Sequence, residues 1–391
     1  MLPAARLFGM TIIMGVLSAL YASAQTFETR ATAAYVLDQS TGTVLMAKNA
    51  DEPLPPASMS KLMTIYMAFE AVADGRLGIN ERLPVSSHAA AYGGSTMFLD
   101  TTDRVSVEDL LRGVIVLSGN DASAVLAEAI AGTEPAFARM MTERGQKMGL
   151  TNSTFMNSNG WPATGHRMSM RDLGILADHL IRDFPTYYPL FAEQTFLFDG
   201  RAPANSNNRN PLLGLGIGAD GLKTGHTQEA GYGLVGSAKQ GDRRVIFVLT
   251  GLDSEAARAE EAEKIVSWAF RQFAQKDVVR AGSRIAEADV WMGSAPTVGL
   301  TVEEDLSLLL PVLDQDAVNA EVIYDGPLEA PIVAGQKVGE LVVTVDGLPT
   351  TTVPLVAASD VAEGGFETRL RVAAQVLLDK IGAWGAEDNP A

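Results

Sequence analysis

Residues 58–61 of this chain are Ser58-Met59-Ser60-Lys61, and two triplets follow in order, Ser118-Gly119-Asn120 and Lys223-Thr224-Gly225. A serine and a lysine three residues apart occur by chance in many proteins, so the first motif alone is a weak signal. The three motifs together are a strong one. They predict an acyl-transfer site in which a lysine takes the part that histidine plays in other serine hydrolases.

The first motif opens a long apolar segment, Met59 to Val72, that contains no proline or glycine and therefore predicts a buried helix. Positions i and i+3 share a helix face, so Lys61 is expected beneath the hydroxyl of Ser58. A lysine acts as a base only when its amine is neutral. Burial and a second nearby cation both lower the pKa of a lysine, and Lys223 is the expected second cation. The alternative, a solvated Ser-Lys pair, fits the apolar flanks poorly.

The second motif is predicted at a break between a helix over Val107 to Leu117 and a helix that runs to Ile130 with Asp121 as its N-cap. In a cleft, the Ser118 hydroxyl can pass a proton to a leaving amine, and the Asn120 carboxamide can hold both the lysine and a substrate carbonyl. Taken alone, the triplet is explained as well by helix capping. The other two motifs favour the site.

The third motif lies on a strand predicted from Leu222 to His226. The ammonium of Lys223 and the hydroxyl of Thr224 can bind a substrate carboxylate by charge-assisted hydrogen bonds. Gly225 lacks a side chain, so an extended peptide could pair with this strand edge. The backbone N–H groups of Ser58 and His226 would then form an oxyanion hole. The alternative for the triplet alone is a β-turn with an exposed lysine.

The remaining pattern predicts an α+β catalytic region over residues 27–276, in which strands at both ends complete one sheet around a middle of helices. The expected strands are 33–37, 43–47, 233–238 and 243–252, and the further expected helices are 135–148, 170–181 and 254–273. Short apolar runs interrupted by Gly, Pro and Asp predict a small all-β domain over residues 278–360. Residues 366–385 have apolar side chains at helical spacing, which predicts an amphipathic helix. Such a helix can lie on a membrane surface or pack on its own domain.

Composition excludes several classes of function. A formal net charge of −17 over 391 residues argues against nucleic-acid binding. The chain has no cysteine, so disulfides, cysteine catalysis and thiolate metal sites are excluded. The four histidines show no H-x-x-x-H spacing, and neither a metal nor an organic cofactor is expected.

The N-terminus predicts export. Arg6 precedes an apolar run from Leu7 to Leu20, and Ala22-Ser23-Ala24 gives the small-x-small pattern of a cleavage site. Residues 1–24 are therefore expected to be a signal peptide, with a retained anchor as the alternative. The expected location is periplasmic, peripheral on the outer face of the cytoplasmic membrane.

The chain resembles the low-molecular-mass penicillin-binding proteins of the serine-type D-alanyl-D-alanine carboxypeptidase family. The resemblance runs from about Ala33 through the terminal helix, and each motif matches over more than its minimal length: Pro56 to Thr64, Ser118 to Ala122, and Gly221 to Thr227. It implies an α/β (α+β) penicillin-recognising serine transferase fold with an antiparallel sheet flanked by helices, then the β domain and the helix. The implied substrate is a peptidoglycan stem that ends in D-Ala-D-Ala, which β-lactams mimic.

The resemblance also implies roles for single residues. Ser58 is implied to be the acylated nucleophile and Lys61 its general base, while Ser118 and Asn120 assist proton transfer and positioning. For the substrate carboxylate the implied residues are Lys223, Thr224 and Arg258, with the His226 N–H at the oxyanion. Arg209, in the segment 208–210, is implied to line the cleft.

Three alternatives remain open at this point. A class A β-lactamase shares the motif types, but Glu134 and Glu143 lack the Glu-x-x-Leu-Asn context of its deacylating glutamate. A D,D-endopeptidase uses the same chemistry on cross-links. A non-catalytic peptidoglycan-binding protein would keep the β domain as its functional part, although the intact motifs argue against that reading.

Overall fold

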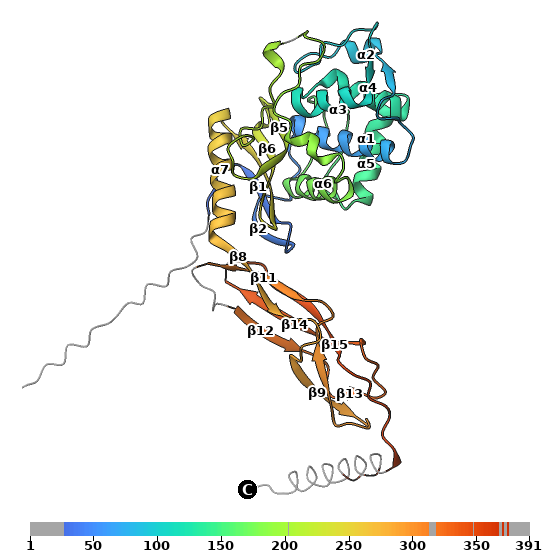
Figure 1. Ribbon diagram of the computed structural model, residues 1–391, viewed down its shortest axis with the longest axis vertical. Helices are drawn as coiled ribbons and strands as arrows, with labels where there is room; N and C mark the ends of the chain where they lie inside the picture. Colours follow the sequence, from blue (N-terminus) through green and yellow to red (C-terminus); the bar gives the residue numbers. More distant parts are fainter. Residues whose placement is uncertain are drawn as a thin grey trace, which may run out of the picture.

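The computed structural model describes residues 27–201, 203–312, 318–346 and 348–366, together with Leu370 and Ala374. Figure 1 shows an upper part with helices around a sheet and an elongated lower part built of strands. The expected signal peptide, residues 1–24, lies outside the described residues, as does most of the expected helix 366–385. Within the part of the chain that is described, no helix is both long and apolar enough to cross a membrane.

The upper part contains a five-stranded sheet in which each strand is antiparallel to its neighbours. Its order is β2 (Thr43–Lys48), β1 (Ala33–Asp38), β7 (Arg243–Leu252), β6 (Gly231–Gln240) and β5 (Ala219–Thr227). Because β1 pairs with β7, strands from both ends of the region lie side by side, and the predicted sheet is confirmed. The strand that carries the third motif, β5, is an edge strand.

Alternating side chains divide this sheet between two cores. Tyr35 and Val248 face a large core that the middle helices cover, whereas Val36 and Phe247 face α7 (Glu255–Gln272). Figure 1 shows α7 on one side of the sheet and the other helices on the opposite side. The helix predicted over 254–273 is thus confirmed within two residues, with Ser254 as its N-cap.

The helix that follows the first motif, α1 (Lys61–Ala73), is central to the large core, and ten of its thirteen residues are buried. Around it lie the short helix α3 (Val107–Arg112) and the long helices α4 (Asn120–Ala131), α5 (Glu134–Lys147) and α6 (Met170–Asp183). The shorter elements are α2 (Ser87–Ala90), β3 (Arg82–Pro84), β4 (Arg104–Ser106) and the 3-10 turns Ala57–Ser60, Tyr188–Ala192 and Pro203–Asn205.

The lower part is all-β, as predicted, and has its own core around Leu300, Leu341 and Leu355. Its first strand, β8 (Phe273–Val279), follows α7 directly and pairs with β11 (Leu306–Pro311). A six-stranded sheet has the order β12 (Val318–Ile323), β14 (Lys337–Val345), β15 (Thr351–Ala357), β10 (Thr297–Thr301), β9 (Ala286–Trp291) and β13 (Leu328–Glu329).

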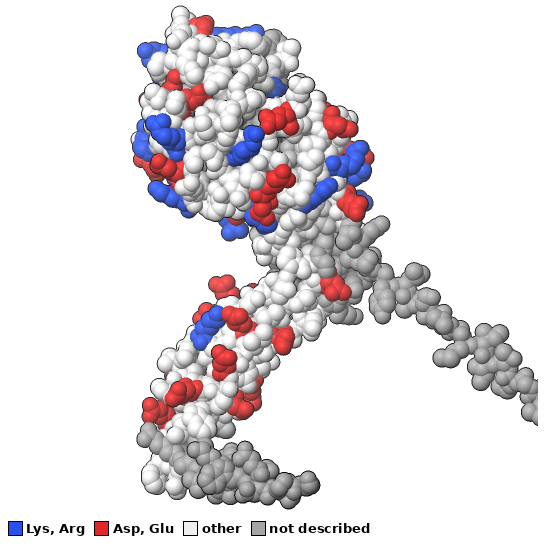
Figure 2. Space-filling view, turned by 180° about the vertical axis from the view of Figure 1, so that it is seen from behind, with Lys and Arg blue, Asp and Glu red and all other residues white. Residues whose placement is uncertain are grey.

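The lower part carries most of the chain's net negative charge. Residues 273–363 have fifteen acidic and four basic side chains, a net charge of −11 out of −17 for the whole chain. In Figure 2 this part displays red groups over most of its length and few blue ones. Charge of this sign keeps the strands soluble and disfavours edge-to-edge association between copies.

The contact between α6 and the sheet gives a stability prediction. A Cβ on Gly174 would lie 2.5 Å from the ring of Tyr35, which is buried and has the Arg171 guanidinium over it. Gly174→Ala should therefore lower the free energy of unfolding by about 1–3 kcal/mol in urea denaturation.

Gly145→Ala is the matched control, because Gly145 is also buried within a helix. Its nearest neighbour would be Leu150 at an ordinary 3.4 Å, so the better helix propensity of alanine should leave stability unchanged or raise it by up to about 1 kcal/mol. Equal effects of the two substitutions would contradict the close contact between α6 and β1.

Candidate active site

Ser58 lies on a tight turn rather than on the helix itself. The sequence predicted an α-helix from Met59, but residues Ala57–Ser60 form a 3-10 turn and α1 begins at Lys61. Ala57 has a φ of 48°, in the left-handed region. Gly160 packs closely behind this turn: a Cβ on Gly160 would lie 1.9 Å from the Ala57 carbonyl oxygen, so only glycine allows this approach.

The amine of Lys61 is the centre of the site. Its Nζ lies 2.9 Å from Ser58 Oγ, 2.7 Å from Asn120 Oδ1 and 2.6 Å from the carbonyl oxygen of Asn159. The side chain is fully buried. A neutral amine has two N–H donors and one lone pair, so it satisfies both acceptors and still accepts the proton of the Ser58 hydroxyl. This arrangement suits a base.

Burial lowers the pKa of Lys61 to about 7, and the positive charge of Arg209 contributes to the shift. From the sequence, Lys223 was expected to be this second cation. The structure corrects that expectation, because the cation that lowers the pKa of Lys61 is Arg209. The pKa of Lys223 is itself lowered well below its ordinary value, by burial and then by the charges of Lys61, Arg209 and Arg258. Arg209, which also loses solvent, stays charged because guanidinium has a far higher pKa than an amine.

Ser118 has a φ of 61° and follows a π-helical turn, Gly113–Leu117, that ends the helix predicted through Leu117. Its hydroxyl is buried and has no hydrogen-bond partner. A left-handed serine with a free hydroxyl is a strained arrangement, and such residues concentrate at functional sites. Helix α4 receives no side-chain cap, so capping does not explain this serine.

Asn120 is the first residue of α4 and uses both ends of its carboxamide. Its Oδ1 accepts from Lys61, and its Nδ2 donates to the Gly93 carbonyl at 2.8 Å. Asp121, predicted to be the N-cap, has a different role. Its carboxylate accepts from the backbone N–H groups of Met97 and Leu99, and it thereby fixes the segment 95–99 beside the site.

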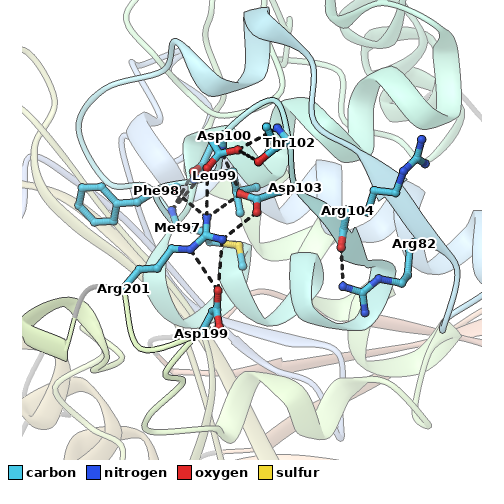
Figure 3. Close-up of polar contacts among 11 residues, drawn as sticks. Arg82, Met97, Phe98, Leu99, Asp100, Thr102, Asp103, Arg104, Asp199 and Arg201 are labelled. Carbon is cyan, nitrogen blue, oxygen red and sulfur yellow. Dashed lines mark hydrogen bonds and ion pairs between the residues drawn. The ribbon is translucent and has the colours of Figure 1, made fainter.

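The segment 199–209 is hydrogen-bonded to the segment 95–99 at three points. Arg209 Nη1 donates to Ser95 Oγ at 2.8 Å, Asn205 Nδ2 to the Thr96 carbonyl at 3.2 Å, and Arg201 Nη1 to the Phe98 carbonyl at 3.1 Å. Figure 3 shows how Arg201 also reaches the carboxylates of Asp103 and Asp199. The segments 95–103 and 199–209 therefore form one rim, which positions Arg209.

Strand β5 forms the facing wall. Lys223 and Thr224 are buried, and His226 stacks on Tyr232 with ring centroids 3.9 Å apart. The sequence explained Gly225 by substrate pairing, but a Cβ there would lie 3.0 Å from both Met59 Cγ and the Pro56 carbonyl oxygen. Position 225 is therefore glycine at least because β5 approaches the Ser58 turn so closely, before any substrate binds.

Arg258, on α7, completes a group of basic side chains with Arg209 and Lys223. Its side chain is buried beneath the ring of Tyr232, 5.7 Å from the centroid, and its Nη2 donates to the Arg209 carbonyl at 3.4 Å. Its Nε is buried without a partner. Its ion pair is with Glu255, at 3.8 Å, whose side chain is exposed. Buried cations with unused donors suit a ligand carboxylate.

These walls enclose an open cleft of about 310 Å³. Its lining includes Ser58, Ser95, Asn120, Asn159, Trp161 and His226. Within the described residues, no group of His, Cys, Asp or Glu side chains has the arrangement of a metal site.

Known proteins share this architecture. A family model described as D-alanyl-D-alanine carboxypeptidase matches residues 20–254, and one described as penicillin-binding protein 5, C-terminal domain, matches residues 273–363. D-alanyl-D-alanine carboxypeptidase DacD of Salmonella typhimurium is 37% identical over 86% of this chain and 87% of its own length.

The chain belongs to the D-alanyl-D-alanine carboxypeptidase family.

Two solved structures extend the comparison. Penicillin-binding protein 5 of Haemophilus influenzae has a TM-score of 0.75 at 35% identity and covers 86% of this chain and 99% of its own. Penicillin-binding protein D2 of Listeria monocytogenes, in an ampicillin-bound form, has a TM-score of 0.57 at 31% identity and covers 62% of this chain and 99% of its own.

In this member of the family, the loop behind Lys61 is held by a carboxylate that the motifs did not reveal. Glu134 accepts from Ser158 N at 2.9 Å, from Ser158 Oγ at 2.5 Å and from the Tyr92 hydroxyl at 2.7 Å. Asn159, whose carbonyl contacts Lys61, follows directly. Sequence reasoning missed Asn159 because its contribution is a backbone atom. The turn-forming residues 157–160 were the only sequence signal that a loop lies here.

Glu134→Gln should destabilise the protein, because its amide NH₂ would replace one of two oxygens that both accept hydrogen bonds: Oε1 from Ser158, or Oε2 from the Tyr92 hydroxyl. Burial alone would raise the pKa of the Glu134 carboxyl, but the hydrogen bonds from Ser158 and Tyr92 hold it below its ordinary value. The stability that this carboxylate contributes is therefore present above about pH 4.3 and is lost as the pH falls through the lowered pKa.

We expect Glu134→Gln to lower the free energy of unfolding by about 2–3 kcal/mol at pH 7 in urea denaturation, and by progressively less below pH 4. Glu143→Gln, an exposed position on the same helix, is the control and should change little. A Glu134 variant as stable as the parent at pH 7 would contradict the role of this carboxylate.

Proposed function

We propose that this protein is a serine-type D-Ala-D-Ala carboxypeptidase, which removes the terminal D-alanine from peptidoglycan pentapeptide stems through an acyl-enzyme on Ser58. β-Lactams are proposed to acylate the same serine. The observation that carries the proposal is the buried Lys61 amine, 2.9 Å from Ser58 Oγ with a pKa of about 7, in a chain of this family. No metal or organic cofactor enters the reaction.

Acylation begins when Lys61 Nζ accepts the proton of the Ser58 hydroxyl. Ser58 Oγ then attacks the carbonyl carbon between the two D-alanines, and the N–H groups of Ser58 and His226 stabilise the oxyanion. The C–N bond breaks as the leaving amine receives a proton. Ser118, whose hydroxyl has no other partner, is the proposed relay for that proton from Lys61.

Deacylation repeats these steps with water in place of the serine. Water attacks the ester carbonyl, Lys61 accepts its proton, and Ser58 Oγ leaves with a proton returned to it. Asn120 keeps Lys61 in place through its Oδ1, at 2.7 Å, during both half-reactions.

The substrate's terminal carboxylate is proposed to bind the group of basic side chains formed by Lys223, Arg209 and Arg258. Lys223 and Thr224 would contact it from β5, with Gly225 leaving the strand close to the nucleophile. Arg209 and Arg258 add charge that is already desolvated. This preference for a free carboxylate favours a carboxypeptidase over an endopeptidase, since a cross-linked substrate need not end at that position.

The β-lactamase alternative is disfavoured by the glutamates between the second and third motifs. Glu134 is buried and engaged by Ser158, Tyr92 and His88, and Glu143 is exposed on α5. Neither is available to activate a deacylating water. The non-catalytic alternative is disfavoured by the intact contacts of Lys61 with Ser58 and Asn120.

For the cell, we propose export by the signal peptide 1–24, with a catalytic domain over 27–276, a β-rich domain over 278–360 and an amphipathic helix over 366–385. Phe366 and Leu370, one helical turn apart, are 80% and 61% exposed, which supports an apolar face free for a membrane surface. The protein would then be periplasmic and peripheral on the cytoplasmic membrane.

Mass spectrometry of a defined pentapeptide muropeptide tests the activity. The intact protein should release one alanine from the stem terminus, and Ser58→Ala and Lys61→Ala should reduce the rate by three or more orders of magnitude, because nucleophile and base act as a unit. Cleavage of a cross-linked dimer in preference to the pentapeptide would instead favour the endopeptidase. An inert intact protein would favour the non-catalytic reading.

The pH dependence of penicillin acylation tests the base. Below the pKa of Lys61 the amine is protonated, so the acylation rate should rise with pH and reach half its limit near pH 7. Arg209→Gln removes a cation that lowers this pKa, so its profile should shift to higher pH. Lys61→Arg should be inactive throughout, since a guanidinium stays protonated. A profile that is flat from pH 5 to 9 would contradict lysine as the base.

A further inference from the structure

Trp161 is a large apolar side chain that remains exposed inside the cleft. Its relative exposure is 46%, although the cleft that it lines contains the nucleophile. Neither the three motifs nor the proposed chemistry uses it. A half-exposed tryptophan beside a reacting serine has apolar surface available for a ligand.

The ring is fixed before any ligand binds. The backbone at Trp161 is anchored, because its amide N–H donates to Asn159 Oδ1 at 2.9 Å and its carbonyl accepts from Asn157 Nδ2 at 2.9 Å. Tyr92 meets the ring edge-on with centroids 6.3 Å apart. A Cβ on Gly94 would lie 3.1 Å from the ring, so the backbone there is in close contact with it. Ordering this side chain therefore costs a ligand little entropy.

The end of β5 that lines the cleft beside Trp161 identifies the part of the substrate that the ring can reach. Trp161 lines the cleft together with His226 and Thr227, whereas the proposed carboxylate-binding residues begin at Lys223. Four residues of extended strand separate Lys223 from Thr227 by roughly 13 Å. Gly225, between these two ends, packs against the Ser58 turn, and the cleft lining contains Ser58, Trp161 and Thr227 but not Lys223. Trp161 is therefore on the side of the acyl group that stays on the serine.

The surroundings of the ring favour an apolar group there. Pro162 continues the same wall, and the nearest charged side chains of the adjoining pocket, Arg167 and Glu229, pair with each other at 3.0 Å. Among the residues that line this subsite, no Lys, Arg, Asp or Glu side chain is thus left unpaired next to an apolar ligand group.

We propose that Trp161 is a specificity-determining residue that binds an apolar side chain on the acyl side of the scissile bond. In a peptide this group belongs to the residue that precedes D-Ala-D-Ala, and in a penicillin it is the aromatic part of the acylamino side chain. The inference rests on the proposed function, because it needs an acyl-enzyme on Ser58.

Two matched pairs of compounds test it. Benzylpenicillin and 6-acetamidopenicillanic acid share the amide and the carboxylate and differ by the phenyl ring. Diacetyl-L-lysyl-D-Ala-D-Ala and acetyl-glycyl-D-Ala-D-Ala differ by the aliphatic side chain. The readouts are the second-order acylation rate for the first pair and kcat/KM for the second.

Trp161→Ala should lower the preference for the larger member of each pair about tenfold, while the smaller member changes less than about threefold. Trp161→Phe should retain most of the preference. Trp291→Ala, at an exposed tryptophan of the β part, should leave both ratios unchanged.

An equal loss for both members of a pair would assign Trp161 a purely structural role and overturn the inference. So would unchanged ratios. A loss confined to the penicillins would overturn the peptide assignment and leave the aromatic one. Failure of the unmodified protein to react with either penicillin is a separate result, which overturns the proposed function and the inference with it.

Discussion

A lysine amine without access to water constrains most of the catalytic part of this molecule. Lys61 is buried at the start of α1, and its three hydrogen-bonding directions are met by Ser58, Asn120 and Asn159. An ammonium in that position loses its hydration and has no carboxylate in contact, so the neutral form is favoured. The same burial that makes α1 a core helix therefore makes Lys61 a base near neutral pH.

Two buried carboxylates order the segments around this amine. Glu134 secures the loop that presents the Asn159 carbonyl, and Asp121 secures the segment 95–99. Both carboxylates are buried and receive several hydrogen bonds, and neither contacts Lys61 directly. Direct contact with a carboxylate would raise the pKa of the lysine and remove its function as a base. The negative charges are thus near enough to order the site without protonating it.

The sequence alone predicted the motifs, the sheet, the core helix and the all-β part, because these follow from hydrophobic periodicity and from residue types with one chemistry. It could not predict contributions that depend on the path of the backbone. The Asn159 carbonyl carries no residue-type signal, and Arg209 acts on Lys61 only because two distant segments form one rim. Gly225 was interpreted through the substrate, whereas its close contact is with the Ser58 turn.

Direct titration of Lys61 tests the account most closely. The Cε or Nζ resonance of this lysine, assigned by comparison with Lys61→Arg, can be followed by NMR in protein with isotopically labelled lysine. A midpoint near pH 7 is expected, about 3.5 pH units below an ordinary lysine. A midpoint near 10.5 in the free enzyme, with normal acylation of Ser58 at pH 7, would contradict a neutral lysine as the base.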